Sequence, residues 1–465
     1  MRIMKKILLI VLSCSLFVSC SDFDEDININ PNIPSEASGT QLIANAQLYL
    51  PGLSSSPQGE FLAQYLAETQ YVGVSLYPEE STSFYGWYQG PLMNLQAVLN
   101  SEEDLSATEG PVANQIAVAK ILKAYFYWNM TDRWGAIPYS EGLQGADNFT
   151  PVYDSQEAIY TNLFEILEEA NNSIVAGNIS NDLIYEGDMS KWKKLGNTIR
   201  LLMALRLSEV DPEWGSQEFN AALSAGIMES NDDNLLFQHL ADANNQSYWY
   251  GQVVASNREW WALTTSLVED MEPVNDPRLE VYGNPARESG EFVGMDYGDT
   301  ENLGTEEYSL LGSDIFAQDA PVYLVTYAQA LFAIAEAAER GWVTEDAEAY
   351  YNMAVEYSIE QWTGSTEGVD EFLSRPEIAY DSSAPIESIA NQRWIHLFMN
   401  GYEAWSEWRR TGFPNDLTEP EGRPIPTRLS YPDNEAFNNA ENYENALQTY
   451  LEGEDNIYGN VWWDV

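Results

Sequence analysis

Cysteine and histidine are nearly absent from this chain, which has two of each among 465 residues. Cys14 and Cys20 both lie near the N-terminus, so the rest of the chain has no thiol for a disulfide, a thiolate metal site or a cysteine nucleophile. His239 and His396 are too few for a multi-histidine zinc site. The GxSxG, P-loop and HExxH motifs are also missing. We therefore expect no enzyme, no cofactor and no metal site.

Basic residues are scarce in comparison with acidic ones. The chain has 21 Lys and Arg against 73 Asp and Glu, which gives a formal net charge of −52. Such a surface repels nucleic acid and anionic lipid, so neither is an expected partner. With so many carboxylates, two acids close together are expected by chance and do not indicate a glycosidase pair.

The apolar run from Ile7 to Val18 is too short to span a bilayer. Arg2, Lys5 and Lys6 precede it, and small residues with a cysteine follow it. This order of a positive segment, an apolar core and small residues is typical of a secretory signal peptide.

A signal peptide that ends at a cysteine resembles a bacterial lipoprotein signal, in which that cysteine is acylated and becomes the new N-terminus. Cys20 leaves an apolar core of normal length, whereas the alternative, Cys14, leaves a short one. The acidic run from Asp22 to Asp26 resembles the surface-export signal of Bacteroidetes lipoproteins. We expect a signal peptide at residues 1–19, lipid on Cys20, and a cell-surface position on the outer membrane.

The remaining chain divides into an acidic tether at residues 20–39 and a single domain at residues 40–465. Apolar residues at helical spacing predict helices at 41–50, 60–69, 112–132, 155–176, 190–210, 386–408 and 438–452, and a helical hairpin at 321–362. The segments 71–91 and 230–313 break this pattern. The second contains a loop at 282–313 with little periodicity, and structureless loops of this length are usually functional. Periodicity alone predicts a mainly α fold with paired helices.

Two helix starts are expected from local signals. Pro321 is placed to open the first helix of the hairpin, since proline favours the first turn. Ser256 and Glu259 form a capping box that predicts a helix containing Trp260 and Trp261.

Several stretches are similar, in chain order, to one family, the SusD/RagB-type outer-membrane lipoproteins. The matching stretches are Thr131–Glu141 (TDRWGAIPYSE), Trp192–Ser208, Asp276–Arg278, Thr326–Ala328 with Ala335–Ala337, Gln392–Trp394 and Gly401–Trp405. The lipoprotein start and the Trp462–Asp464 end fit the same family. The resemblance extends over nearly the whole chain and is strongest to the SusD-like branch associated with starch binding.

The resemblance implies a fold, a task and a partner. The fold is a scaffold of tetratricopeptide-like helix pairs with an irregular, loop-rich half packed on it. The task is to capture oligosaccharides without catalysis and to deliver them to a TonB-dependent, SusC-like barrel in the outer membrane. A peptide-binding surface lipoprotein of the same transporter class is the alternative.

Aromatic residues are plentiful, with 15 Trp, 28 Tyr and 16 Phe. A sugar offers an apolar C–H face to a flat ring and a rim of hydroxyls to polar side chains. Aromatic residues at helical spacing are expected in the core, namely Trp192, Trp260, Trp261, Trp394 and Trp405. Those in the irregular segments are the candidate ligand-binding residues, namely Tyr85, Trp87, Trp249, Tyr250 and Tyr297. We expect Tyr85 with Trp87, and Trp249 with Tyr250, to converge on one surface.

His396 and the Arg409–Arg410 pair could be functional groups, but a structural role is expected for both. His396 lies between Trp394 and Phe398, which favours a structural histidine over a catalytic one. The Arg409–Arg410 pair lies at the predicted end of a helix, where ion pairing in so acidic a chain is the expected role.

Overall fold

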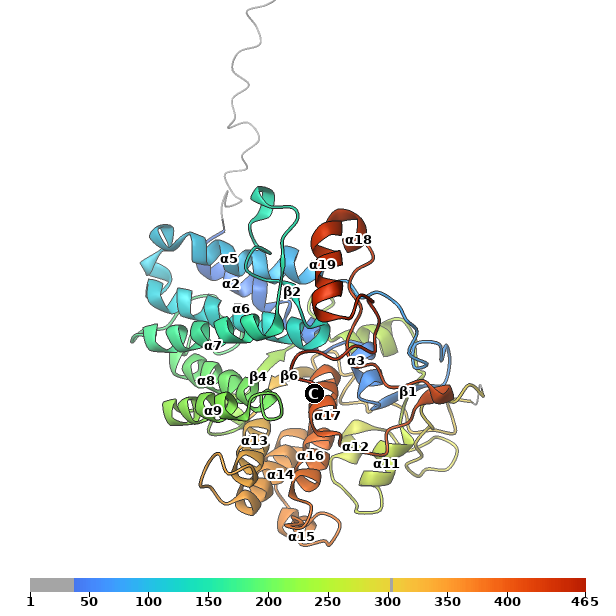
Figure 1. Ribbon diagram of the computed structural model, residues 1–465. Coiled ribbons are helices and arrows are strands. Elements are labelled where there is room, and N and C mark those ends of the chain that lie inside the picture. Colours follow the sequence, from blue (N-terminus) through green and yellow to red (C-terminus); the bar gives the residue numbers. More distant parts are fainter. Residues whose placement is uncertain (1–36, 302–303) are drawn as a thin grey trace, which may run out of the picture. The chain divides into compact units, whose positions relative to one another are not determined.

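Helices dominate the computed structural model, which describes residues 37–301 and 304–465 (Figure 1). The signal peptide, Cys20 and most of the predicted tether lie outside the described residues. The α-helices are α2 (Gly39–Gln47), α3 (Pro57–Leu62), α4 (Tyr85–Trp87), α5 (Met93–Asn100), α6 (Val112–Trp134), α7 (Gln156–Ser173), α8 (Met189–Arg206), α9 (Pro212–Ala225), α10 (Tyr248–Tyr250), α11 (Thr265–Met271), α12 (Leu279–Tyr282), α13 (Tyr327–Glu339), α14 (Ala347–Thr363), α15 (Val369–Leu373), α16 (Pro385–His396), α17 (Gly401–Thr411), α18 (Glu435–Asn438) and α19 (Ala440–Tyr450). Short 3-10 or π-helical turns are η2 (Leu50–Leu53), η3 (Tyr88–Leu92), η4 (Glu102–Asp104), η5 (Ala107–Glu109), η6 (Gly145–Asp147), η7 (Asn231–Asp233), η8 (Gly251–Ala255) and η9 (Pro420–Gly422).

Successive helices pack in pairs, α6 with α7, α8 with α9, α13 with α14, and α16 with α17. Local signals start several of them. Ser155 caps α7, Asp346 caps α14, and Thr326 forms a capping box with Gln329 at the start of α13. Figure 1 shows α6, α7, α8, α9, α13 and α14 stacked along one side of the unit formed by residues 39–465, with β1 (Leu66–Glu68), α11 and α12 on the other. The predicted mainly α fold of tetratricopeptide-like pairs beside a loop-rich half is confirmed.

The described residues form three two-stranded antiparallel sheets, and two of them join segments that are distant in sequence. The strand β1 pairs with β5 (Trp261–Leu263), and β2 (Ile137–Pro138) pairs with β3 (Tyr153–Asp154). The third sheet pairs β4 (Leu235–Gln238) with β6 (Pro321–Val325), with a register shift between Leu235 and Leu236. The β1–β5 pair joins two parts of the loop-rich half, whereas β6 contacts the scaffold helix α8.

Both predicted helix starts in the irregular half are wrong. Trp261 belongs to the strand β5, because β1 offers it a backbone partner, and the next helix, α11, starts after the cap Thr264. Pro321 opens the strand β6, because β4 pairs with it, and helix α13 starts six residues later at Tyr327. In both places a distant strand outweighs the local signal.

The helix predicted at 386–408 is two helices. It breaks between His396 and Gly401, where Met399 has a left-handed φ of 64°. The Asn400 side chain donates to the Leu324 carbonyl at 3.0 Å. The break therefore ties this region to the strand β6.

Charged side chains form a buried network where α8, α13, α16 and α17 meet. Arg410 binds Glu336 through two contacts, at 2.5 and 2.7 Å, and binds Glu407 at 2.6 Å. Arg393 contacts both of these glutamates, and Arg206 contacts Glu407. The predicted ion-paired role is thus confirmed for Arg410, which pairs within the core.

His396 is a structural histidine of the core, as predicted. Its ring nitrogens lie 2.7 Å from the Thr326 hydroxyl and 2.9 Å from the Ser358 hydroxyl. Burial, aided by the charges of Arg278 and Arg393, lowers the pKa of His396 to about 3. The ring is therefore neutral at physiological pH.

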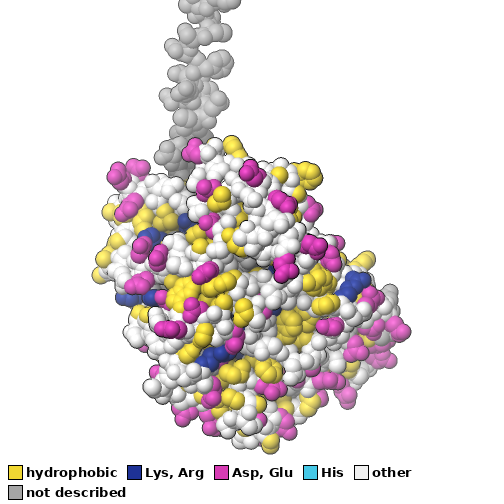
Figure 2. All heavy atoms as spheres, in the orientation of Figure 1, with side chains coloured by type: hydrophobic (Ala, Val, Ile, Leu, Met, Phe, Trp, Pro, Cys, Tyr) yellow, Lys and Arg dark blue, Asp and Glu magenta, His cyan; other side chains and the backbone are white. Residues whose placement is uncertain are grey.

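Acidic side chains are scattered over the visible face of the molecule, and basic ones occur there in few places (Figure 2). In the part of the chain that the structure covers, no helix combines the length and the apolar character needed to cross a membrane.

Candidate functional site

The pairing of β1 with β5 places two aromatic residues side by side on the loop-rich half. Ala67 lies opposite Ala262, and just beyond this ladder the Thr69 amide donates to the Trp260 carbonyl at 2.9 Å. The chain then turns at Tyr71, whose φ is 61°. As a result, the Tyr71 ring lies edge-on to Trp260, with 5.3 Å between the ring centroids.

Tyr71 begins a row of neighbouring rings that leads from solvent into the core. Successive centroids are 5.3 Å apart from Trp260 to Trp261, 5.2 Å from Trp261 to Trp249, and 5.3 Å from Trp249 to Tyr248. We call Tyr71, Trp260, Trp261, Trp249 and Tyr248 the aromatic row. Tyr71 is 74% exposed and Trp260 partly exposed, whereas Trp261 and Trp249 are each 4% exposed. Tyr71 is therefore the most exposed ring of the row, and Tyr248 at the far end is half-buried like Trp260.

Polar groups surround the outer end of the aromatic row. The Arg258 guanidinium carbon lies 5.7 Å from the Trp260 ring centroid and Arg258 donates to the Gln252 amide oxygen at 2.8 Å. The outer end thus offers two aromatic rings, a planar cation and a carboxamide. These are the groups that recognise the apolar face and the hydroxyls of a sugar.

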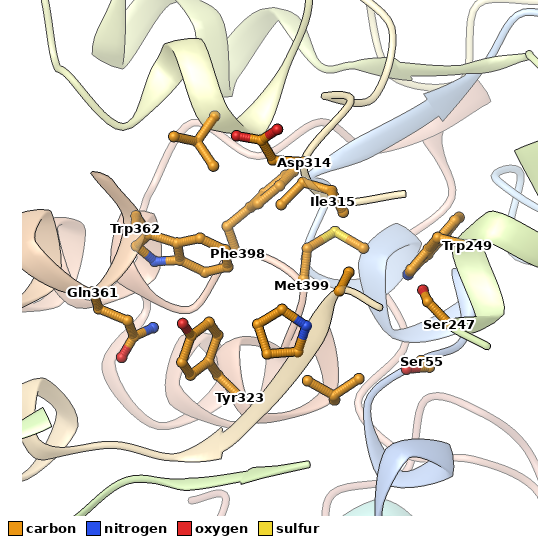
Figure 3. A pocket seen from close by; sticks show the side chains of 14 residues that line it. Ser55, Ser247, Trp249, Asp314, Ile315, Tyr323, Gln361, Trp362, Phe398 and Met399 are labelled. Carbon is orange, nitrogen blue, oxygen red and sulfur yellow. The ribbon is translucent and has the colours of Figure 1, made fainter. Parts of the chain in front are cut away.

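Trp249, in the buried part of the aromatic row, faces a cavity of about 140 Å³ (Figure 3). Trp249 from α10, Tyr323 from β6 and Trp362 from α14 line it, together with Phe398 and Met399. In Figure 3, Met399 lies between Trp362 and Trp249. Pockets for drug-sized ligands span roughly 300–1,000 Å³, so this cavity has room only for the end of a longer molecule.

The polar lining of this cavity comes from Ser55, Ser247, Asp314 and Gln361. The Trp362 indole N–H is already committed, because it donates to the His396 carbonyl at 3.1 Å. Gln361 accepts from the Asn234 amide at 3.1 Å. Among the described residues, no group of three or more His, Cys, Asp or Glu side chains is arranged to hold a metal ion.

The predicted ligand residues differ in where the structure places them. Trp249 is buried but lines the cavity, and Tyr250 beside it is half-buried. Tyr297 is 5% exposed, with its centroid 5.6 Å from that of Tyr77, so it is packed in the core and not in an open loop. Trp87 is half-buried over Gly52.

Tyr85 lines a different cleft, which shares no lining residue with the cavity at Trp249. The sequence predicted that the pair Tyr85 and Trp87 and the pair Trp249 and Tyr250 converge on one surface, whereas the structure places Tyr85 and Trp249 in two separate pockets. Ligand contact by the predicted residues stays a prediction.

Sequence reasoning missed the accessible end of the aromatic row. Trp260 was expected in the core of a helix, but it precedes a strand and is only half-buried. Tyr71 lies in the irregular, aromatic-rich segment 71–91, yet nothing local distinguishes it from its aromatic neighbours. Its contact with Trp260 depends on a strand pairing across nearly 200 residues of sequence.

Comparisons with known proteins agree with this architecture. A family profile described as "starch-binding associating with outer membrane", SusD-like, matches residues 31–432. A solved chitin-binding protein is 30% identical, with a TM-score of 0.81 over 92% of this chain and 100% of its own. A SusD homologue from Bacteroides fragilis is 26% identical, with a TM-score of 0.80 over 92% of this chain and 99% of its own.

A chitin-binding SusD homologue from Flavobacterium johnsoniae is 23% identical, with a TM-score of 0.76 over 92% of this chain and 98% of its own, and it supports the fold alone. No curated protein sequence matches this chain. The profile match extends over most of the chain, as does the likeness to the 30% identical structure. The chain belongs to the SusD-like family of starch-binding proteins that associate with the outer membrane.

Proposed function

We propose that this protein captures oligosaccharides at the cell surface, without catalysis, and delivers them to a SusC-like, TonB-dependent transporter. The observation that carries the proposal is the accessible pair formed by Tyr71 and Trp260 beside Arg258. A starch-binding family and a chitin-binding relative support a glycan as the ligand.

The geometry supports different ligand contacts at different positions along the aromatic row. Sugar rings stack at Tyr71 and Trp260, where Arg258 and Gln252 meet their hydroxyls. Trp249 is the predicted ligand residue best placed for a further contact, because it lines the cavity that a chain end can enter.

The alternative ligand, an extended peptide, finds no support at this site. A peptide that adds to a sheet needs a free strand edge. One edge of β5 pairs with β1, and on its other edge Leu263 donates to Ser309 at 2.8 Å while Leu311 donates to Trp261 at 3.0 Å. Both edges of β5 are therefore occupied.

The Tyr71→Ala variant is expected to weaken oligosaccharide binding by about 1–3 kcal/mol, judged from ring stacking on other flat ligands. The melting temperature should stay unchanged, since the side chain is 74% exposed. Calorimetry with maltoheptaose and chitohexaose measures the affinity. Phe437→Ala, at an 84% exposed ring outside the aromatic row, is the matched control. Unaltered affinity in both Tyr71→Ala and Trp260→Ala would contradict the proposal.

Attachment to the membrane is proposed to depend on Cys20. Cys20→Ala should release the protein from the membrane fraction, whereas Cys14→Ala should leave it there, because acyl chains on the new N-terminus provide the hydrophobic anchor. Immunoblots of fractionated cells distinguish the two variants, and equal retention of both would show that Cys20 is not the lipid site.

Tethering raises the effective concentration near the transporter, so a weak protein interface suffices.

A further inference from the structure

A larger cleft lies away from the aromatic row, between the start of α4, the loop that joins β2 to β3, and α18. We call it the Tyr85 cleft. Its volume is about 440 Å³. In Figure 1, α18 and α19 lie beside the loop between β2 and β3, and the Asn439 amide donates to the Pro151 carbonyl at 2.8 Å. The lining residues on which the argument depends are Tyr85, Tyr88, Asn148, Phe149, Glu435 and Asn438.

Aromatic rings and carboxamides both line the Tyr85 cleft. Tyr85 and Tyr88 are half-buried, and Phe149 on the facing loop is 79% exposed. Phe149 differs from other exposed rings because it lines the cleft, where it offers an apolar surface to a ligand. Asn148 and Asn438 contribute amide groups to the same cleft.

Buried hydrogen bonds hold the walls of the cleft in place. The Glu435 carboxylate, whose residue is 5% exposed, accepts from the Tyr85 hydroxyl at 2.5 Å and from the Tyr153 hydroxyl at 2.6 Å. The Tyr88 hydroxyl donates to the Pro138 carbonyl. Asn148 donates to Glu141 at 2.8 Å. Walls that are already ordered reduce the entropy lost on binding.

The charge of the Tyr85 cleft limits the class of ligand. None of the described residues that line it is a lysine or an arginine, so an anion would find no counter-charge. Its one carboxylate, Glu435, already accepts from two tyrosine hydroxyls. What remains for a ligand is aromatic surface and uncharged amides, within a volume typical of small-molecule sites.

We infer that the Tyr85 cleft is a second binding site for an uncharged oligosaccharide, separate from the aromatic row. The ligand class rests on the proposed function, whereas the position of the site rests on the cleft itself. Two sites on one chain would bind a long glycan at both places, which strengthens retention without new contacts.

Calorimetry on the full-length chain in detergent, with maltoheptaose and chitohexaose as probes, tests this inference. The wild-type protein should bind at least one of the two sugars in two events. Phe149→Ala should weaken one event at least about fivefold and leave the other unchanged, whereas Tyr71→Ala should do the reverse. Phe149 is exposed, so the melting temperature should not change. Phe437→Ala, on α18 but outside the lining, is the matched control and should leave both events unchanged.

Each contrary result points to a different failure. A single binding event that Tyr71→Ala abolishes and Phe149→Ala leaves unchanged would overturn the second site alone. Binding of neither sugar by the wild-type protein would overturn the proposed function and the second site together. If Phe149→Ala and Phe437→Ala both abolish co-purification with an outer-membrane barrel but leave sugar binding intact, the cleft is a protein-docking face and the inference is wrong.

Discussion

Glu336→Gln is expected to lower the free energy of unfolding by about 3–5 kcal/mol, the cost of breaking a buried ion pair from one side. Glu336 is 1% exposed and accepts hydrogen bonds from three arginines, Arg410, Arg393 and Arg340. These guanidinium groups hold its pKa well below the ordinary value despite burial. The glutamine variant removes the charge that compensates them while keeping almost the same volume.

Urea unfolding at neutral pH measures this effect, because the midpoint shifts when stability changes and the slope does not. Glu339→Gln is the matched control on the same helix. Glu339 is exposed and accepts from the Tyr380 hydroxyl at 2.5 Å, so its loss should cost about 0.5 kcal/mol or less. Equal stability of the two variants would show that the buried network contributes little. Because the pKa of Glu336 is lowered in the folded state, its contribution is lost as the pH falls.

Glu60→Gln is expected to make the protein more stable at pH 8 and to remove part of its pH dependence. Burial raises the pKa of Glu60 from 4.5 to about 8, against the opposing effect of hydrogen bonds from the Gly401 and Met399 amides. Since the folded pKa is above the unfolded one, the contribution of Glu60 is present below pH 4.5 and is lost as the pH rises through about 8. The loss amounts to about 1.4 kcal/mol per pH unit.

The pH window from 6.5 to 8 isolates the Glu60 effect best. Below pH 6.5 the lowered pKa of His396 acts in the opposite direction, because the unfolded state takes up a proton that the folded state excludes. Across this window the wild-type protein should lose about 2 kcal/mol more than Glu60→Gln. The exposed Glu79→Gln should keep the wild-type slope. Urea unfolding at each pH gives the free energy of unfolding as a function of pH. If its slope is the same for the wild-type protein and Glu60→Gln, Glu60 is ionised in the folded state.

The helical scaffold could be predicted because its signals are local. The apolar spacing and the Ser155 cap of α7 both act within one helix. The helix predicted at 155–176 is therefore close to the observed one, Gln156–Ser173. The capping box at Ser256 is also a local signal, yet Trp261 lies in a strand because it pairs with β1. Pro321 fails for the same reason, because β4 pairs with the segment that follows it.

The sequence by itself determined the class of the protein. Scarce cysteine, an acidic composition and family motifs in chain order lead to a mainly α protein of the SusD-like family that associates with the outer membrane. Which aromatic rings reach solvent was decided only by tertiary structure. Tyr71 meets Trp260, and Trp249 is covered, because exposure depends on neighbours contributed by strand pairs and helices far away along the chain. Local composition cannot distinguish a ring that packs from a ring that binds, since both are apolar and flat.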